Sequence, residues 1–190
     1  MSTIITQNLK GPTSGGNANK VIMAAGQTLE TPEVIQSNYE LDQWRLTDTF
    51  STNDANITGW ERPHDSSFGR IGTGMTESSG IFTFPSTGVY LVTTNVRIYV
   101  AGNDATAGYK VQVSTDGGSS SDAIASIYEG DTSANDSNTS GSSSNLINVT
   151  NASTFQVWLK TAALGSGSTI RGNTNENQSM ITFERKGPSQ

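Results

Sequence analysis

From residue 39 onward the chain consists of short runs in which apolar and polar residues alternate, separated by turn residues. In YKVQVS, residues 109–114, every second position is apolar, and Phe155, Val157 and Leu159 repeat the pattern. Alternation of this kind gives a strand one buried and one solvated face. No helical period or heptad repeat interrupts it. We therefore predict an all-β sandwich of antiparallel strands, at about 43–50, 57–62, 67–73, 79–84, 88–100, 108–115, 122–128, 145–150, 153–161, 168–172 and 179–185.

The most regular run is GIFTFPSTGVYLV, residues 80–92. Phe82 and Phe84 lie on one side of an extended segment, Pro85 sets the first corner of a turn, and Gly88 supplies the freedom to enter the next strand. The run predicts a β-hairpin with a PSTG loop. The strand that follows alternates up to residue 100 and is long enough to lie in the middle of a sheet.

Two segments lack the apolar residues that packing requires. Residues 129–145, EGDTSANDSNTSGSSSN, contain one alanine and no larger apolar side chain, which predicts a surface loop. Residues 1–37 contain one short apolar run, KVIMAAGQTL, and cannot form a core alone. We predict an N-terminal arm over 1–37 that docks on a partner, with a disordered tail as the alternative, and a β domain over 38–190.

Composition narrows the classes of partner. The 190 residues carry a net charge of -6, and no basic stripe offsets it, so nucleic acid is not an expected partner. No apolar run approaches the ~20 residues that cross a bilayer, and the first residues lack the layout of a signal peptide, so membrane insertion is not expected. The chain has no cysteine, which leaves packing or assembly as the sources of stability.

Catalytic chemistry has weak support. The single histidine, His64, lies in GWERPHDSS, but neighbouring residues in one loop do not aim three side chains at a common point, and no G-x-S-x-G elbow is present. Paired carboxylates of the glycosidase type are the other option, but the acidic residues fall mostly in predicted loops. We expect a non-enzyme in which His64 is a turn or edge residue.

Metal binding is a second option that the sequence leaves open. Asp116, Asp122, Asp131 and Asp136 lie in loops rich in Gly, Ser and Asn, which supply the oxygen ligands that calcium prefers. No EF-hand spacing is present, and aspartates in such loops usually cap turns. We expect no cofactor, with calcium as the alternative.

The segment TGMTESSGIFTFPSTGVYLVTTNVRIYV resembles the core of the C1q/TNF-like jelly roll. The fold motif is carried by six residues: Gly80, Phe82, Pro85, Gly88, Tyr90 and Val92. The tail SMITFERKG, residues 179–187, resembles the final strand of that family. The resemblance implies a homotrimer in which aromatic and apolar side chains of one sheet face the three-fold axis. The candidates for that face are Tyr99, Tyr109, Trp158 and Phe183, whose alternative role is ordinary core or surface packing.

A second resemblance is to virion proteins of tailed phages, especially those of marine and cyanobacterial hosts, which pair a segment like NKVIMAAGQTLETP with a Cys-free β domain ending in a line such as ITFERKG. It implies a virion protein assembled in the host cytoplasm. We therefore expect a non-catalytic capsid-decoration (cement) or tail-fibre-knob trimer that docks on a capsid or tail protein through residues 1–37. The alternatives are a C1q-like module for host attachment that binds a glycan or protein, and a small glycan-degrading enzyme.

Overall fold

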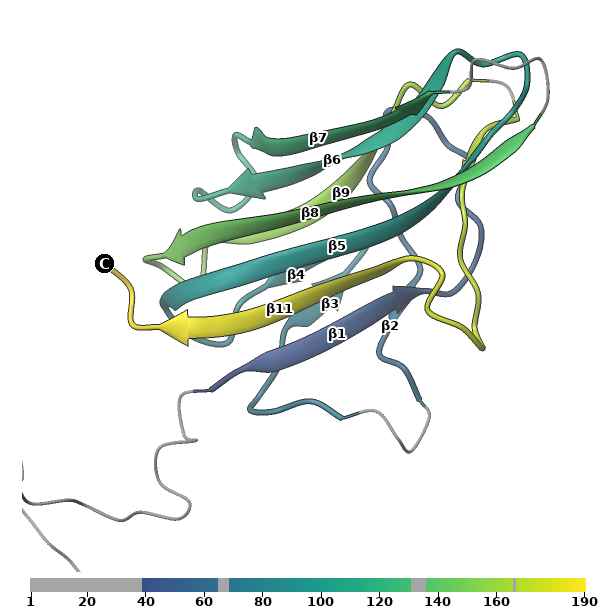
Figure 1. The fold of residues 1–190 in the computed structure, drawn as a ribbon. Helices are drawn as coiled ribbons and strands as arrows, with labels where there is room; N and C mark the ends of the chain where they lie inside the picture. The colour runs from purple at the N-terminus through teal and green to yellow at the C-terminus, as the bar shows by residue number, and fades with distance from the viewer. Residues whose placement is uncertain (1–38, 65–68, 131–135, 166) are drawn as a thin grey trace, which may run out of the picture. The chain divides into compact units, whose positions relative to one another are not determined.

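The computed structural model describes residues 39–64, 69–130, 136–165 and 167–190, and these form two layers of antiparallel strands (Figure 1). The described residues contain no helix, so the all-β prediction is confirmed. The strands are β1 (Leu41–Leu46), β2 (Trp60–Glu61), β3 (Thr76–Ser78), β4 (Ile81–Thr83), β5 (Gly88–Val100), β6 (Thr106–Ser114), β7 (Asp122–Gly130), β8 (Ser137–Val149), β9 (Gln156–Ala162), β10 (Thr169–Ile170) and β11 (Met180–Gly187).

The strands of each sheet come from distant parts of the chain. In the first sheet, called sheet A, the path runs β10-β5-β11-β1-β2, and β8 pairs with the other edge of β5. The second sheet, sheet B, has the order β3-β4-β9-β6-β7. β8 is paired with β5 over its whole length, from Val149 opposite Gly88 to Ser137 opposite Val100. Each sheet is therefore held together by hydrogen bonds between strands that are distant in the sequence.

The core lies between the two sheets and follows the alternation of the sequence. Along β5 every second residue, from Gly88 to Val100, is buried, while the residues between them face outward. At one end of the core the ring of Phe82 meets three other rings, with centroid distances of 5.5 Å to Trp44, 6.0 Å to Trp60 and 5.0 Å to Phe183. These contacts join the inner faces of both sheets.

The segment around PSTG is a crossing between the sheets, and the predicted hairpin is wrong. β4 pairs with β3 and β9 in sheet B, whereas β5 pairs with β8 and β11 in sheet A. The chain changes sheet at the turn that follows Phe84, whose ring lies 4.8 Å from that of Tyr90. The Tyr90 hydroxyl donates a hydrogen bond of 3.0 Å to the carbonyl of Ser86 and fixes the corner. The same turn residues suit a hairpin and a crossing, and the strand partners decide between them.

The predicted surface loop 129–145 is also wrong over most of its described length. Glu129 and Gly130 end β7, and residues 137–145 belong to β8, the edge strand of sheet A (Figure 1). The expectation failed because it required apolar side chains on the inner face of a strand. Here that face carries small polar residues, and hydrogen bonds satisfy them.

Smaller differences concern the edges of the sheets. β3 was not predicted. Of the predicted strand 67–73 the structure describes residues 69–73, and among these only Ile71 pairs with a neighbour, as an isolated bridge to Leu41. The predicted docking arm, residues 1–37, lies outside the described residues. A helix long and apolar enough to cross a membrane is absent from the described part of the chain.

Candidate functional site

The four aromatic residues predicted for a trimer face do not share one surface. Tyr109 and Phe183 are completely buried in the core, so neither ring is available to a second chain. Trp158 alternates with the inward-facing residues of β9, so it lies on the outer side of sheet B, 8% exposed. Tyr99 lies on the outer side of sheet A, partly exposed. Of the four, Tyr99 alone faces outward from sheet A.

Tyr109 is instead the centre of a buried polar network that explains the composition of β8. Its hydroxyl lies 2.8 Å from the hydroxyl of Thr94 and donates a 3.1 Å hydrogen bond to the carbonyl of Gly141. Thr94 also lies 2.8 Å from the hydroxyl of Ser143. Burial raises the pKa of Tyr109 to about 12. Small polar side chains are therefore accommodated inside the sandwich at this strand, because each finds a partner.

The outer side of sheet A carries an uncharged region that is bordered by Glu184 on β11 and Arg97 on β5. Leu91 of β5 lies between Leu146 of β8 and Glu184 of β11, and the next outward pairs along β5 and β8 are Thr93–Ser144 and Asn95–Ser142. Leu146 is 67% exposed, an unusual position for a large apolar side chain. We call this surface the uncharged face; it consists of Leu91, Thr93, Asn95, Ser142, Ser144, Leu146, Met180 and Thr182. Charge-poor surfaces with an apolar centre are typical of protein interfaces.

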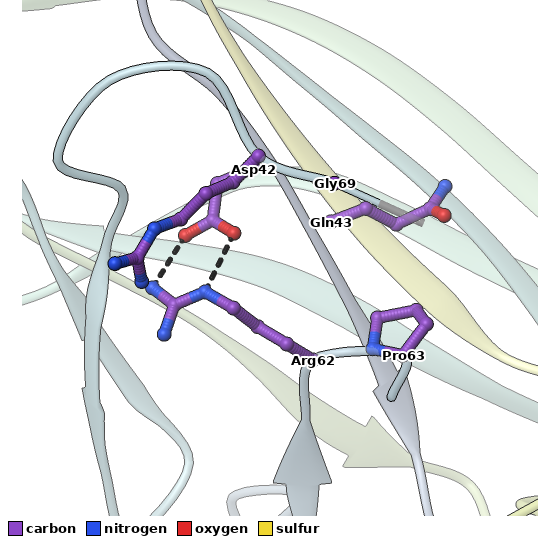
Figure 2. Close-up of a pocket in the computed structure, with 6 residues that line it drawn as sticks. Asp42, Gln43, Arg62, Pro63 and Gly69 are labelled. Atoms are coloured by element: carbon purple, nitrogen blue, oxygen red, sulfur yellow. Dashed lines mark hydrogen bonds and ion pairs between the residues drawn. The ribbon is translucent and has the colours of Figure 1, made fainter. Parts of the chain in front are cut away.

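A second polar feature is the ion pair of Asp42 and Arg62, which borders a hollow of about 180 Å³ (Figure 2). Arg62 Nε donates to Asp42 Oδ1 at 2.8 Å, and Nη2 donates to Oδ2 at 2.8 Å. Oδ2 also accepts from the backbone N–H of Met75 at 2.7 Å and from the indole of Trp44 at 3.0 Å. The carboxylate is thus fully used in joining β1 to the segment before β3, and it does not offer a free base for catalysis.

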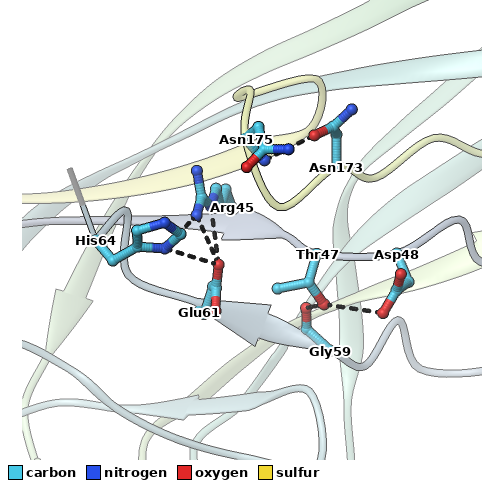
Figure 3. Close-up of polar contacts among 8 residues, drawn as sticks. All are labelled: Arg45, Thr47, Asp48, Gly59, Glu61, His64, Asn173 and Asn175. Carbon is cyan, nitrogen blue, oxygen red and sulfur yellow. Dashed lines mark hydrogen bonds and ion pairs between the residues drawn. The ribbon is translucent and has the colours of Figure 1, made fainter.

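His64 lies beside the ion pair of Arg45 and Glu61 (Figure 3). Its Nδ1 lies 2.7 Å from Nη2 of Arg45 and 3.6 Å from Oε1 of Glu61, and the Arg45–Glu61 pair itself measures 2.7 Å. Because an arginine can only donate, Nδ1 of His64 acts as the acceptor in this contact. The described neighbours of His64 thus form a charge cluster, and no nucleophile is among them. Residues 65–67, which the triad interpretation requires, are not described.

The aspartates considered for calcium have separate local roles. Asp116 accepts from the hydroxyl of Ser120 at 2.6 Å, from its N–H at 3.0 Å, and from Ser114 Oγ at 2.8 Å, and these bonds lower its pKa to about 2. Asp136 accepts from the N–H of Gly102 at 3.0 Å, and its hydrogen bond from the Tyr99 hydroxyl lowers its pKa. Asp122 begins β7, and Asp131 is not described. Within the described ranges, no three acidic or histidine side chains gather as metal ligands.

Comparison with known proteins identifies the fold. No protein-family model matches the sequence, and no curated protein matches it. Among solved structures, murine APRIL at pH 8.5 matches with a TM-score of 0.58 and 13% identity, over 78% of this chain and 99% of that chain. Eiger TNF from S. frugiperda matches with a TM-score of 0.62 and 14% identity, over 80% and 95%. The prediction of a C1q/TNF-like jelly roll is confirmed.

Proposed function

We propose that this chain is a non-catalytic module that assembles as a homotrimer through the uncharged face of sheet A. The observation that carries the proposal is the exposure of Leu146 opposite Leu91 at the centre of that face. Burying an exposed leucine side chain contributes about 1.5–3 kcal/mol, and three subunits bury three of them. The surrounding Ser, Thr and Asn residues carry no charge, and Glu184, which lies opposite Leu91, has Lys186 as its ion-pair partner at 2.7 Å.

The fold supports this mode of assembly. C1q/TNF-like domains, which the sequence resembles at Gly80, Phe82 and Tyr90, associate as three-fold bundles through one of their two sheets. In this chain the outer side of sheet B is less suitable, because Lys110 lies opposite Lys160 at its centre. Sheet A, with its uncharged centre, is therefore the sheet that faces the axis.

The proposed setting is the virion of a tailed phage. The module would decorate the capsid or form a tail-fibre knob, with residues 1–37 docking on a capsid or tail protein and the jelly roll projecting outward. The support is the resemblance of residues 19–32 and 181–187 to segments of phage virion proteins. A chain without cysteine also fits assembly in a reducing cytoplasm.

The interface can be tested by site-specific cross-linking, because the chain has no cysteine of its own. A Leu146→Cys variant treated with a short bis-maleimide is expected to give cross-linked subunits. Ser126→Cys is the matched control, since Ser126 is exposed on β7 in sheet B. Equal cross-linking of both variants, or cross-linking of the control alone, would refute the uncharged face as the interface.

The virion setting needs a separate test. Purified particles are expected to contain the chain, and a chain that lacks residues 1–37 is expected to stay in the soluble fraction with its β domain folded by circular dichroism. Antibody labelling would then locate the protein on heads or tails. Particles without the protein would refute the setting and leave the trimer untouched.

The second candidate is a C1q-like module for host attachment, which binds a glycan or a protein. It is favoured by one observation, a polar hollow beside Tyr99 that is lined by two arginines. An attachment module and a virion trimer are compatible, because the hollow does not include the Leu91–Leu146 pair.

A further inference from the structure

A polar hollow of about 410 Å³ opens on the outer side of sheet A, where β5 approaches its end. Its walls come from four separate segments: the residues after β1, β5, β8 and the connection from β10 to β11. The lining residues are Thr49, Arg97, Asn138, Arg171, Gly172 and Gln178. The hollow is open to solvent and its lining is mainly polar.

The backbones of the two arginines are fixed relative to each other. The N–H of Arg171 donates to the carbonyl of Arg97 at 2.9 Å. The hydroxyl of Ser179, which is completely buried, accepts from the N–H of Arg97 at 3.0 Å and donates to the carbonyl of Arg171 at 2.6 Å. The guanidinium of Arg171 lies over the ring of Tyr99, 4.4 Å from its centroid. Because these parts of the site are already ordered, the protein loses less conformational entropy when a ligand binds.

Neither guanidinium forms an ion pair with a carboxylate of the described residues. Acidic residues close to the lining have other partners: Asp136 accepts from Tyr99 and Gly102, Glu176 accepts from the amide of Gln178 at 3.3 Å, and Asp48 accepts from the hydroxyl of Thr47 at 3.5 Å. Two cations therefore line one hollow in a chain whose net charge is -6. An anion is the complementary ligand.

We infer that the hollow formed by Arg97 and Arg171 binds the carboxylate of an acidic sugar. A guanidinium presents a planar pair of N–H donors that matches a carboxylate. The amide of Asn138 and the hydroxyl of Thr49 provide the neutral donors and acceptors that sugar hydroxyls require. The overall negative charge disfavours a chain of phosphates, whereas one carboxylate among neutral hydroxyls fits the lining.

The site goes beyond the proposed assembly and does not depend on it. Arg97 lies six residues after Leu91 on the same face of β5, which places the two side chains about 20 Å apart at ~3.3 Å per residue. An interface centred on Leu91 and Leu146 therefore leaves the hollow near its margin. Binding and oligomeric state are two separate measurements.

The test is a calorimetric titration of the full chain with sodium glucuronate, with glucose and inorganic phosphate as comparison ligands. Arg97→Gln and Arg171→Gln are each expected to weaken glucuronate binding about tenfold or more, the effect of losing a charge-assisted hydrogen bond. Arg97→Lys keeps the charge without the planar donors and is expected to fall between wild type and Arg97→Gln. Lys110→Gln, with the same charge change on sheet B, is the matched control.

We expect saturable binding of glucuronate, with glucose and phosphate at least tenfold weaker, and unchanged thermal unfolding of the Arg97 variants. The inference is overturned if glucuronate does not bind, if Arg97→Gln binds as well as wild type, or if phosphate binds equally well. A monomer that binds glucuronate would refute the assembly alone. A trimer that does not bind it would refute the ligand site alone.

Discussion

The carboxylate of Asp42 and the guanidinium of Arg62 form a two-point ion pair in which both N–O distances are 2.8 Å (Figure 2). Asp42 is only 1% exposed, and Arg62 also donates to the carbonyl of Met75 at 2.6 Å and lies over the ring of Trp44. One buried acid thus links β1 to Arg62, which follows β2, and to Met75, which precedes β3. Loss of the carboxylate is costly, because the N–H groups of Met75 and Trp44 and the partly exposed guanidinium of Arg62 would all lose their shared acceptor.

Replacement of Asp42 by Asn is expected to lower the free energy of unfolding by about 3 kcal/mol, since the guanidinium of Arg62 loses its counter-charge. Asp54→Asn is the matched control, because Asp54 pairs with Lys160 at 2.9 Å but is 81% exposed. An exposed pair of this kind contributes little to stability, because solvent screens it, so a much smaller loss is expected than for Asp42→Asn. Urea unfolding of both variants measures the difference, and equal losses would contradict a structural role for Asp42.

Asp116 gives the protein a predictable response to acid. Hydrogen bonds from Ser120 and Ser114 lower its pKa from the ordinary 3.8 to about 2. A carboxyl whose pKa is lowered by folding stabilises the native state above its unfolded pKa, and the contribution is lost as the pH falls through the folded pKa. Asp116→Asn is therefore expected to be less stable than wild type at pH 7, with a difference that disappears between about pH 4 and pH 2. Thermal unfolding across this range measures it.

The same experiment has an internal check. Ser120→Ala removes the hydroxyl that donates to Asp116 at 2.6 Å, so the pKa of Asp116 is expected to rise toward 3.8. Carboxyl chemical shifts followed by NMR report this pKa directly. An unchanged pKa in Ser120→Ala would show that the turn does not act through that hydroxyl.

Tyr109 is expected to be the last of the five tyrosines to ionise. Its pKa is raised from 10.0 to about 12, mainly by burial. A group whose pKa is raised by folding stabilises the native state below its unfolded pKa, and the contribution is lost as the pH rises through the folded value. Absorbance at the tyrosinate band should show a late step that Tyr109→Phe removes. A late step that persists in Tyr109→Phe would contradict this assignment.

Substitution of Gly141 tests how closely β8 packs against sheet B at this position. A Cβ at this position would overlap the side chain of Ile127 and lie 3.4 Å from Cε1 of Tyr109. Gly141→Ala is therefore expected to destabilise the fold by about 1–3 kcal/mol through overpacking. Ser142→Ala, one residue further along the same strand and facing outward, is expected to change stability by less than about 0.5 kcal/mol. Similar melting temperatures for the two variants would contradict the predicted contact.

The sequence predicts those strands whose inner faces are apolar. β5, β9 and β11 follow directly from alternation, and Phe82, Tyr90 and Val92 are buried as the motif implies. The first part of β8, residues 137–144, escaped prediction because the partners of its inner face are the hydroxyls of Thr94 and Tyr109, which lie far away in the sequence. Hydrophobic periodicity carries no signal for a strand of this kind.

The candidate sites are also formed by residues that lie far apart in the sequence. Asp42 lies in β1 and Arg62 directly follows β2, so only the folded chain brings them together. A signal for Asp42 was present: it alternates with Trp44 and Leu46, which places a carboxylate on an inward-facing position of β1. Its partner has no such signal. Arg97 and Arg171 likewise meet only because Ser179 and the edge of β5 align their backbones.

The proposed trimer is tested most directly by native mass spectrometry of the purified full chain beside a Leu146→Glu variant. Wild type is expected at three times the mass of one 20.1 kDa chain. Leu146→Glu places a charge at the centre of the uncharged face and is expected to give a monomer with an unchanged β-sheet circular dichroism spectrum. A wild-type monomer, or a trimer that persists in Leu146→Glu, would contradict assembly through this face.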